Sequence, residues 1–449
     1  MVKIHTIGGF SEVGKNMLCL ELEDDAFVLD EGFFLPPLVT MEEREKFEYT
    51  EKKLAGIGAI PDFSMIHDIK HKVRAQLIGH AHLDHVGAVP YISDNFNAPI
   101  CGTPFTTAVL RSLLKDNNSS SNELLLRNKI KSVEPNRSVQ IQGKHKKYDV
   151  EFINVTHSTP HSAIIAIRTD KGYFLYANDF KLDDNPMLGL KTNYKRLREI
   201  AKEGVRALVI DSLYSGTDRK TPSEKIAHTL LEEVLLTIQN RNAGVIVTTF
   251  SSHIARLKSI TDFAKRMNRQ PIFLGRSLNK YSEAAREVGI APFLKDVKIV
   301  KYRKEVEKNL KRVNDNRRRY LIVCTGHQGE PGSIMDRIAR SQVPYRIDKD
   351  DNIVFSSSVI PADINKENFS KMEEELRRKK ARIFRDVHVS GHAGREDLRD
   401  MINLLQPEHI IPAHGGSDKT TPMAELAGEL GYKLGKNCHL MNDGGVLKV

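Results

Sequence analysis

The segment His80-Ala81-His82-Leu83-Asp84-His85 places four potential metal ligands directly after the apolar stretch 76–79. In an extended loop, His80 and His82 would flank one ion. Asp84 and His85 follow where the chain should turn into a helix, and they can address a second ion. Imidazole and carboxylate groups in this mixture suit zinc. The competing interpretation is that Asp84 caps a helix and the histidines are exposed, but four ligands within six positions favour the metal site.

Three further candidate ligands, His157, Asp179 and His414, each follow a hydrophobic, strand-like stretch of the sequence. Taken singly, a residue in such a position is more often a capping or hydrogen-bonding group than a ligand. Their shared position at the end of a predicted strand is where a layered fold draws the ligands of a metal site. We therefore treat the three as one set with the six-residue segment.

Composition indicates a soluble globular protein. The chain has 449 residues, of which 40% are hydrophobic and 28% are charged, and this length predicts two or three domains. No run of about 18 apolar residues occurs, so the sequence predicts no membrane-spanning helix. The first residues resemble a strand entering a turn rather than an export signal, which predicts a cytoplasmic protein.

The four cysteines form no short C-x-x-C pair and lie in or beside apolar, strand-like stretches. We interpret them as buried free thiols rather than as disulfides or zinc ligands. Any metal ligands must then come from the 17 histidines and from carboxylates. The cysteines are Cys19, Cys101, Cys324 and Cys438.

The positive charge of the chain is concentrated in one region. Of a net charge of +10, residues 241–320 carry +13, with 20 lysines and arginines against 7 acidic residues. Such a module on a near-neutral body predicts a polyanionic partner, because lysine and arginine neutralise phosphates and release counterions. The alternative is an ordinary solvated surface.

The pattern of predicted elements changes twice along the chain. Roughly the first 210 residues consist of short strands and turns. Thr221-Pro222-Ser223-Glu224 then begins a helix, and strands alternate with helices as in a parallel, doubly wound sheet. The last stretch returns to strand–loop–helix units, with a strand expected at 387–389. We therefore expect one domain inserted into another.

Seven ordered motifs cover essentially the whole chain. The first four are Asp30 in Leu29-Asp30-Glu31-Gly32, the segment 80–85, His157 and Asp179. The last three are Asp211 in Asp211-Ser212, His392 in Ser390-Gly391-His392-Ala393, and His414 in Pro412-Ala413-His414-Gly415. This succession resembles the metallo-β-lactamase superfamily and, within it, the β-CASP nucleases.

Within this group, four further segments resemble the ribonuclease J family. They are residues 8–9 together with 12–16, residues 178–181, residues 325–330 and residues 355–358. We expect neither N-terminal KH-type modules nor an additional C-terminal domain, so the chain is expected to be similar to the short, archaeal type. The resemblance implies an α/β fold: an αββα metallo-β-lactamase sandwich with an inserted β-CASP domain whose sheet is mainly parallel. We expect the sandwich in residues 1–213 and 380–449 and the inserted domain in residues 214–379.

The resemblance also implies a site with two Zn²⁺ ions, for which Mn²⁺ or Mg²⁺ are alternative ions. The expected ligands are His80, His82 and His157 for one ion, Asp84, His85 and His414 for the other, and Asp179 between them. Asp30 would orient a metal-binding histidine rather than bind metal.

Catalytic roles are implied for three residues. His392 would protonate the leaving 3′ oxygen, Asp211 would hold its imidazole in the right tautomer, and Asp84 would act at the metal centre. A histidine at the position of His414 is associated with RNA rather than DNA substrates in this group. Contacts with RNA or its terminal phosphate are expected from Ser251, Ser252, His253, Ser390, Gly391, His392 and Gly394.

The resemblance implies a homodimer that hydrolyses single-stranded RNA, as a 5′-to-3′ exoribonuclease preferring 5′-monophosphate ends in RNA decay or processing. The first alternative is an endoribonuclease using the same zinc site. A small-molecule hydrolase of the lactamase or glyoxalase kind would leave the basic insertion without a role, and a non-catalytic RNA-binding scaffold would not need the full ligand set. Glu31, His161 and His253 depart from the family pattern.

Overall fold

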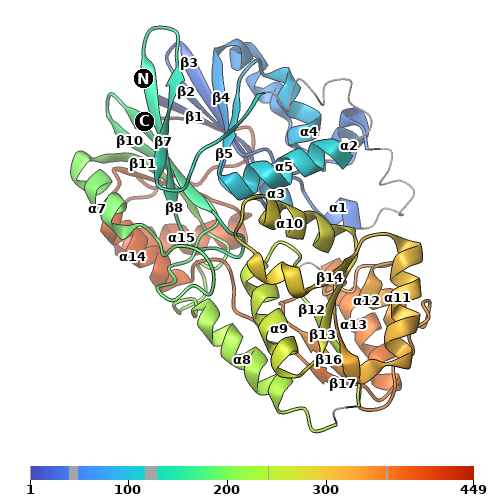
Figure 1. Cartoon of the computed structure of the whole chain (residues 1–449). Helices are drawn as coiled ribbons and strands as arrows, with labels where there is room; N and C mark the ends of the chain where they lie inside the picture. The colour runs from blue at the N-terminus through green and yellow to red at the C-terminus, as the bar shows by residue number, and fades with distance from the viewer. Residues whose placement is uncertain (1, 40–48, 117–128, 241, 361–362) are drawn as a thin grey trace. The chain divides into compact units, whose positions relative to one another are not determined.

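The computed structural model describes residues 2–39, 49–116, 129–240, 242–360 and 363–449 (Figure 1). The chain forms two compact units. Unit 1 comprises residues 1–184, 190–221 and 391–449, and unit 2 comprises residues 185–189 and 222–390. Unit 1 is thus assembled from both ends of the chain, with unit 2 formed by the sequence between them. The domain boundaries given above stay a prediction.

Unit 1 contains two sheets, one of seven strands and one of six. The first has the order β19-β1-β2-β3-β4-β5-β6 and the second the order β18-β11-β10-β9-β8-β7. The strands of the first sheet are β1 (Val2–Gly8), β2 (Met17–Leu22), β3 (Asp25–Leu29), β4 (Val73–Ile78), β5 (Ile100–Gly102), β6 (Ile130–Ser132) and β19 (Val446–Lys448). Those of the second are β7 (Arg137–Gln142), β8 (Lys147–Asn154), β9 (Ala163–Thr169), β10 (Gly172–Ala177), β11 (Val205–Asp211) and β18 (His409–Ala413).

A shared core joins the two sheets. Leu20 and Phe27 of the first sheet and Phe152, Ile165 and Phe174 of the second belong to one cluster of buried side chains. Inner strands such as β2, β3 and β10 are buried on both sides, because the middle of each sheet is covered on both faces. The structure therefore confirms the predicted α/β sandwich, with sheet on sheet at its centre.

Helices cover the outer face of each sheet in unit 1 (Figure 1). On the first sheet, Leu54, Ile92 and Leu110 lie in the outer clusters. The elements there are α1 (Pro36–Val39), α2 (Glu51–Gly56), η2 (Phe63–Lys72), α3 (Leu83–Val86), α4 (Val89–Ile92), η3 (Ser93–Asn95) and α5 (Pro104–Asp116). On the second sheet, the outer cluster is formed with α7 (Tyr194–Glu203), α14 (Arg395–Leu405) and α15 (Ser417–Glu429).

Unit 2 is built on a single sheet whose strands are all parallel, in the order β14-β13-β15-β12-β16-β17. The strands are β12 (Val245–Thr248), β13 (Gln270–Leu274), β14 (Lys298–Val300), β15 (Tyr320–Cys324), β16 (Asn352–Phe355) and β17 (Arg382–Phe384). The helical segments are α8 (Glu224–Leu236), α9 (Ile254–Arg266), α10 (Arg276–Glu287), η4 (Pro292–Asp296), α11 (Arg303–Asp315), η5 (Arg317–Arg319), α12 (Ile334–Ala339) and α13 (Asp363–Arg378). This architecture confirms the prediction of a parallel, doubly wound sheet.

One local prediction was wrong. Residues 387–389 are not a strand, and the last strand of unit 2 is β17. Side chains, rather than a neighbouring strand, form hydrogen bonds with the backbone there. The Val387 carbonyl accepts from the Ser356 hydroxyl at 2.8 Å and lies 3.4 Å from the Arg256 guanidinium. From an apolar run of three residues alone, one cannot tell whether a buried carbonyl will bond to a neighbouring strand or to side chains.

The four cysteines are buried and unpaired, as predicted, and none belongs to the groups of potential metal ligands found in the described residues. No helix in the described part of the chain is both long and apolar enough to cross a membrane.

Candidate metal centre

The carboxyl ends of parallel strands carry the predicted site residues of unit 1. β3 and β4 are parallel, and Asp30 and His80 follow them. In the second sheet β10, β11 and β18 are parallel, and they lead into Asp179, Asp211 and His414. Parallel neighbours end at the same edge of a sheet, so residues far apart in the sequence converge.

Three of these residues adopt left-handed backbone conformations at the point where the strand stops. The φ angles are 58° at Asp30, 55° at Asp179 and 61° at His414. This region is uncommon for residues other than glycine, although aspartate and histidine enter it more readily than most. Such outliers concentrate at functional sites, where the surrounding structure holds them in place.

The segment 80–85 leads into the short helix α3. His82, rather than Asp84, is its N-cap, and no side-chain hydrogen bond caps the helix. Asp84 instead lies in the first turn, where its carboxylate is 3.6 Å from His85 Nε2. The interpretation of Asp84 as a helix cap is therefore wrong.

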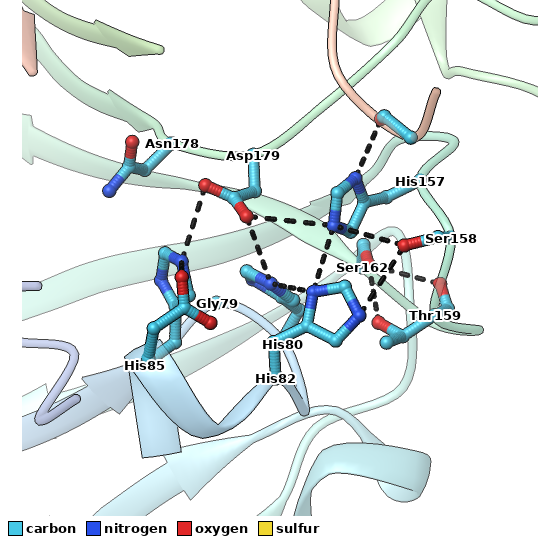
Figure 2. A network of polar contacts seen from close by, with 12 residues as sticks. Gly79, His80, His82, His85, His157, Ser158, Thr159, Ser162, Asn178 and Asp179 are labelled. Carbon is cyan, nitrogen blue, oxygen red and sulfur yellow. Dashed lines mark hydrogen bonds and ion pairs between the residues drawn. The ribbon is translucent and has the colours of Figure 1, made fainter. Parts of the chain in front are cut away.

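The first ligand group consists of His80, His82, His157 and Asp179 (Figure 2). His82 Nδ1 lies 3.1 Å from both His80 Nε2 and His157 Nε2. Asp179 Oδ2 lies 3.3 Å from His80 Nε2 and 3.5 Å from His157 Nε2. Tetrahedral zinc, with bonds of about 2.0–2.2 Å, separates its ligand atoms by about 3.3–3.6 Å. The four separations, 3.1–3.5 Å, lie within about 0.2 Å of that range, so these atoms suit a zinc ion.

The second group consists of Asp84, His85, Asp179 and His414. Asp179 Oδ1 lies 3.2 Å from His85 Nε2 and 3.5 Å from His414 Nδ1. This oxygen is buried and has no hydrogen-bond donor among the described residues. A buried carboxylate oxygen without a donor is costly, and a cation between the ligands would satisfy it. Asp179 thus faces both groups, one oxygen toward each.

Hydrogen bonds outside the two groups orient the imidazoles. His157 Nδ1 lies 2.7 Å from the Gly391 carbonyl, and His85 Nδ1 lies 2.6 Å from Asp30 Oδ2. When Nδ1 carries the proton in each of these bonds, Nε2 keeps its lone pair for a metal. Asp30 also accepts from the Gly79 backbone at 2.8 Å, so it holds a histidine and the start of the loop together.

The electrostatic environment divides the histidines into two kinds. Burial lowers the pKa of His80, and it lowers the pKa values of His82 and His157 well below the usual range, with the neighbouring histidines acting in the same direction. These three are neutral, as metal ligands must be. Burial would also lower the pKa of His85, but the carboxylates of Asp179, Asp84 and Asp30 raise it well above its usual value.

The same histidines depress the pKa of the carboxylate between them. Burial alone would raise the pKa of Asp179, but His414, His85, His392 and His80 lower it well below the usual range. The carboxylate is therefore ionised, which a bridging ligand requires.

His392 and Asp211 form a pair beside the first group. His392 Nδ1 lies 2.8 Å from Asp211 Oδ2, and His392 Nε2 lies 3.7 Å from Asp179 Oδ2. Burial would lower the pKa of His392, but the carboxylates of Asp179 and Asp211 raise it to about 9. The two carboxylates thus favour the protonated imidazole, and Nε2 is directed at the ligand group.

The residues expected to contact RNA are distributed over both units. Ser251, Ser252 and His253 lie between β12 and α9 in unit 2, with Ser390 at its last position. His253 accepts a capping bond from the Arg256 backbone at 3.4 Å and lies 3.4 Å from Glu224.

In unit 1, the backbone around His392 packs closely on the first ligand group. A side chain at position 391 would come within 3.0 Å of both His157 and Ser158, so glycine is required for this approach. Gly394, at the start of α14, has the Arg219 carbonyl 2.2 Å from where a Cβ would be.

Asn16, which has no predicted role, contacts three residues of the second group. Its Nδ2 is 3.1 Å from His85 Nε2, and its Oδ1 is 3.0 Å from His414 Nδ1 and accepts from Asn178 Nδ2 at 3.0 Å. Asn16 also donates to the Asp84 carbonyl at 2.9 Å. An asparagine just before a strand carries no periodic signal, so only the resemblance of segment 12–16 pointed to it.

The departures Glu31 and His161 lie beside the site without joining either group. Glu31 is buried and bonded to the Ser93 hydroxyl, and burial raises its pKa to about 8. His161 has a left-handed φ of 57°, and its carbonyl accepts from the Thr103 hydroxyl at 2.7 Å. Neither belongs to the potential ligand groups of the described residues.

Comparison with known families finds two matches in the second half of the chain. Residues 242–376 match the family described as "Ribonuclease J, beta-CASP domain". Residues 377–441 match "Zn-dependent metallo-hydrolase RNA specificity domain".

Whole-chain relatives include the ribonuclease J of Methanocaldococcus jannaschii, which is 38% identical over 99% of this chain and 98% of its own length. The ribonuclease J of Pyrococcus abyssi is 39% identical over 100% of this chain and 97% of its own. Among solved structures, a protein of unknown function from Enterococcus faecalis matches 99% of both chains with a TM-score of 0.64 and 15% identity. At that identity the likeness concerns the fold alone.

Proposed function

Because the chain belongs to the ribonuclease J family, we propose that it is a zinc-dependent ribonuclease that hydrolyses RNA phosphodiesters. The observation that carries the proposal is Asp179, whose two carboxylate oxygens face two separate histidine groups. The matched description of residues 377–441 as a zinc-dependent metallo-hydrolase region supports the choice of metal. The relatives' name supports the choice of substrate.

We propose two Zn²⁺ ions, one held by His80, His82 and His157, the other by Asp84, His85 and His414, with Asp179 between them. Zinc in this site would supply Lewis acidity, activating water for attack and neutralising charge on the phosphodiester. Asp30 and Asn16 would fix the orientation of the ligand imidazoles through the contacts described above. The inserted domain is proposed to span residues 214–379.

His392 is proposed as the general acid that protonates the leaving 3′ oxygen. Support comes from the 2.8 Å contact of His392 Nδ1 with Asp211, which fixes the tautomer and leaves Nε2–H directed at the ligands. Asp211 is a positioning residue in this scheme, because it acts through the imidazole.

The His392→Gln variant is expected to lower RNA hydrolysis by about 10²–10⁴-fold, the usual range for general acid–base catalysis. Hydrolysis of bis(p-nitrophenyl) phosphate should fall far less, since nitrophenolate leaves without a proton. Steady-state kinetics on both substrates and zinc analysis of the purified protein would measure this. The matched control is His145→Gln, which removes an imidazole that is 71% exposed. An equal loss on both substrates would contradict the acid role.

For direction and end preference, we propose 5′-to-3′ exonuclease activity on single-stranded RNA that favours a 5′-monophosphate. The proposed phosphate contacts are Ser251, Ser252, His253, Ser390, Gly391, His392 and Gly394, with hydroxyl, imidazole and backbone N–H donors. Support comes from the motif resemblance and family membership. The proposed setting is a cytoplasmic homodimer.

A time course on one RNA sequence with a labelled 3′ end tests this proposal. The 5′-monophosphorylated RNA is expected to disappear without labelled intermediates and to be degraded faster than its 5′-triphosphorylated form. An RNA whose 5′ end is blocked should be stable. Discrete labelled fragments from the blocked RNA would instead establish the endonuclease alternative. No cleavage of any RNA by zinc-loaded protein would contradict ribonuclease function itself.

A further inference from the structure

Within residues 241–320 of unit 2, the positive charge is concentrated toward the C-terminal end. Residues 295–320 alone contain eleven lysines and arginines against four acidic residues. They run from the end of η4 through β14, α11 and η5 to the first residue of β15. A field of this density attracts polyanions over distances comparable with the Debye length.

Part of this region forms a pocket of about 580 Å³ at the amino ends of β13, β14 and β15. Ligand pockets typically occupy about 300–1,000 Å³. Four cationic side chains line the pocket: Lys295, Lys298, Arg312 and Arg319. The pocket lies at the opposite edge of the unit 2 sheet from the strand ends that lead into Thr249–His253 and Thr325–Glu330, because all the strands are parallel.

The four cations of the pocket face a single carboxylate among the lining residues. Asp296 is the one acidic residue of the lining, and its carboxylate pairs at 2.5 Å with Lys265, which lies outside the lining. In the part of the chain that the structure describes, none of the four lining cations forms an ion pair. An anion entering the pocket would therefore meet positive charge without displacing a paired carboxylate from these four cations.

The walls of the pocket are held in place by contacts of their own. The Arg312 guanidinium lies 5.8 Å from the Tyr320 ring centroid, and Lys298 Nζ donates to Asn309 Oδ1 at 2.5 Å. Gln270 Nε2 donates to the Asp296 carbonyl at 2.7 Å, joining the start of β13 to the end of η4. These contacts reduce the ordering cost of binding.

A second anchor fixes η5, which supplies Arg319. The Arg317 guanidinium, at the first position of η5, lies 2.5 Å from the buried Asp351 carboxylate. The Arg317 side chain points toward this buried carboxylate, while the next residues, Arg318 and Arg319, are exposed. Arginine donors suit phosphate oxygens, which they can bind through two parallel hydrogen bonds.

We propose that this pocket is a phosphate-binding site of unit 2. Its ligand is the phosphate of an RNA chain or of a free nucleotide polyphosphate. The first source rests on the proposed ribonuclease function, and phosphate binding as such does not. The site would retain an RNA chain through its backbone, without reading its sequence.

The test compares two double variants of the full-length, zinc-loaded protein that lose the same charge. Arg312→Gln/Arg319→Gln alters the pocket, and Lys304→Gln/Lys308→Gln alters exposed lysines of α11 outside the lining. Binding is measured by fluorescence anisotropy over a series of salt concentrations. The probes are a 30-nucleotide phosphorothioate RNA with a 5′-hydroxyl end, which resists hydrolysis and lacks the terminal phosphate, and ATP.

For RNA as the ligand, the pocket variant is expected to bind the 30-mer about 10-fold more weakly at 0.1 M salt. A plot of the logarithm of the binding constant against the logarithm of the salt concentration should become less steep by about 1.4, or 0.7 for each lost phosphate contact. The control variant should change affinity by less than about 2-fold. If only ATP binding weakens, the phosphate site stands and its ligand is a free nucleotide.

Equal weakening by both double variants would overturn the pocket, since charge alone would then account for binding. Unchanged binding of both probes would overturn it as well. Thermal unfolding verifies that each variant is folded, and Lys295→Gln/Lys298→Gln repeats the test from other lining residues. Failure of the proposed function would show separately, as RNA bound but never cleaved.

Discussion

Replacing Asp179 by asparagine is expected to lower RNA hydrolysis by at least about 10³-fold, comparable with losing a principal electrostatic group of an active site. The zinc content of the purified protein should fall as well. Asparagine keeps the shape of the side chain and tolerates the left-handed backbone at this position. What it removes is the negative charge and one of the two oxygens that face the ligand groups.

Single-turnover cleavage of 3′-labelled RNA and metal analysis of dialysed protein would measure the two effects. The matched control is Asp170→Asn, because Asp170 is 83% exposed and pairs with Lys146 at the surface. That variant should retain both activity and zinc. Wild-type hydrolysis by an Asp179→Asn protein with full zinc content would refute the assignment of Asp179.

The second large effect is expected in unit 2, where Arg256 is completely buried. Its guanidinium forms two bonds to the Glu224 carboxylate, at 2.6 and 2.9 Å, and donates to the Ser356 carbonyl at 2.9 Å. Arg256→Met would leave the Glu224 charge buried without its principal partner. Breaking a buried pair in this way costs about 3–5 kcal/mol, so unit 2 should unfold at clearly lower denaturant concentration or temperature.

The control for this effect is Arg266→Met, which removes an arginine–glutamate pair of the same unit with the same 2.6 Å contact. Arg266 is 54% exposed and its partner Glu232 is 38% exposed, and such surface pairs contribute about 0–1 kcal/mol. Hydrogen exchange in α8 and α9 would localise the loss to unit 2. Equal effects of the two substitutions would contradict the argument from burial.

The Glu224–Arg256 pair also makes the stability of unit 2 depend on pH. Burial alone would raise the pKa of Glu224, but Arg256 and His253 lower it well below its ordinary 4.5. Because the folded-state pKa lies below the unfolded one, this stabilisation is complete above about pH 4.5 and disappears as the pH falls toward the folded value. The wild-type protein should therefore lose unit 2 stability in acid more steeply than the Arg256→Met variant.

Much of the candidate site could be predicted because its residues follow hydrophobic strands. Asp179, Asp211 and His414 stand at the ends of β10, β11 and β18, and the alternation of apolar strands with polar ends is visible in a single sequence. That these strands are parallel neighbours, and thus share an edge, is a long-range property that periodicity does not contain. Here the motif resemblance supplied what local patterns could not.

Two features had no local signal. The 387–389 segment has the composition of a strand, but its carbonyl is bonded by Arg256 and Ser356 from distant parts of unit 2. Asn16 contacts both His85 and His414 from a loop whose residues show no periodicity. In both cases the decisive partner lies far away in the sequence, and a pattern read over a short window cannot identify it.

The left-handed residues Asp30, Asp179 and His414 have a consequence for the folding of the scaffold. Each conformation costs about 1–2 kcal/mol for a residue with a Cβ. Together they consume a sizeable fraction of the 5–15 kcal/mol by which a typical domain is stable. The large double-sheet core of unit 1 supplies this reserve. The backbone at these three strand ends therefore depends on the packed core around it, and a variant that loosens this core would also disturb the site.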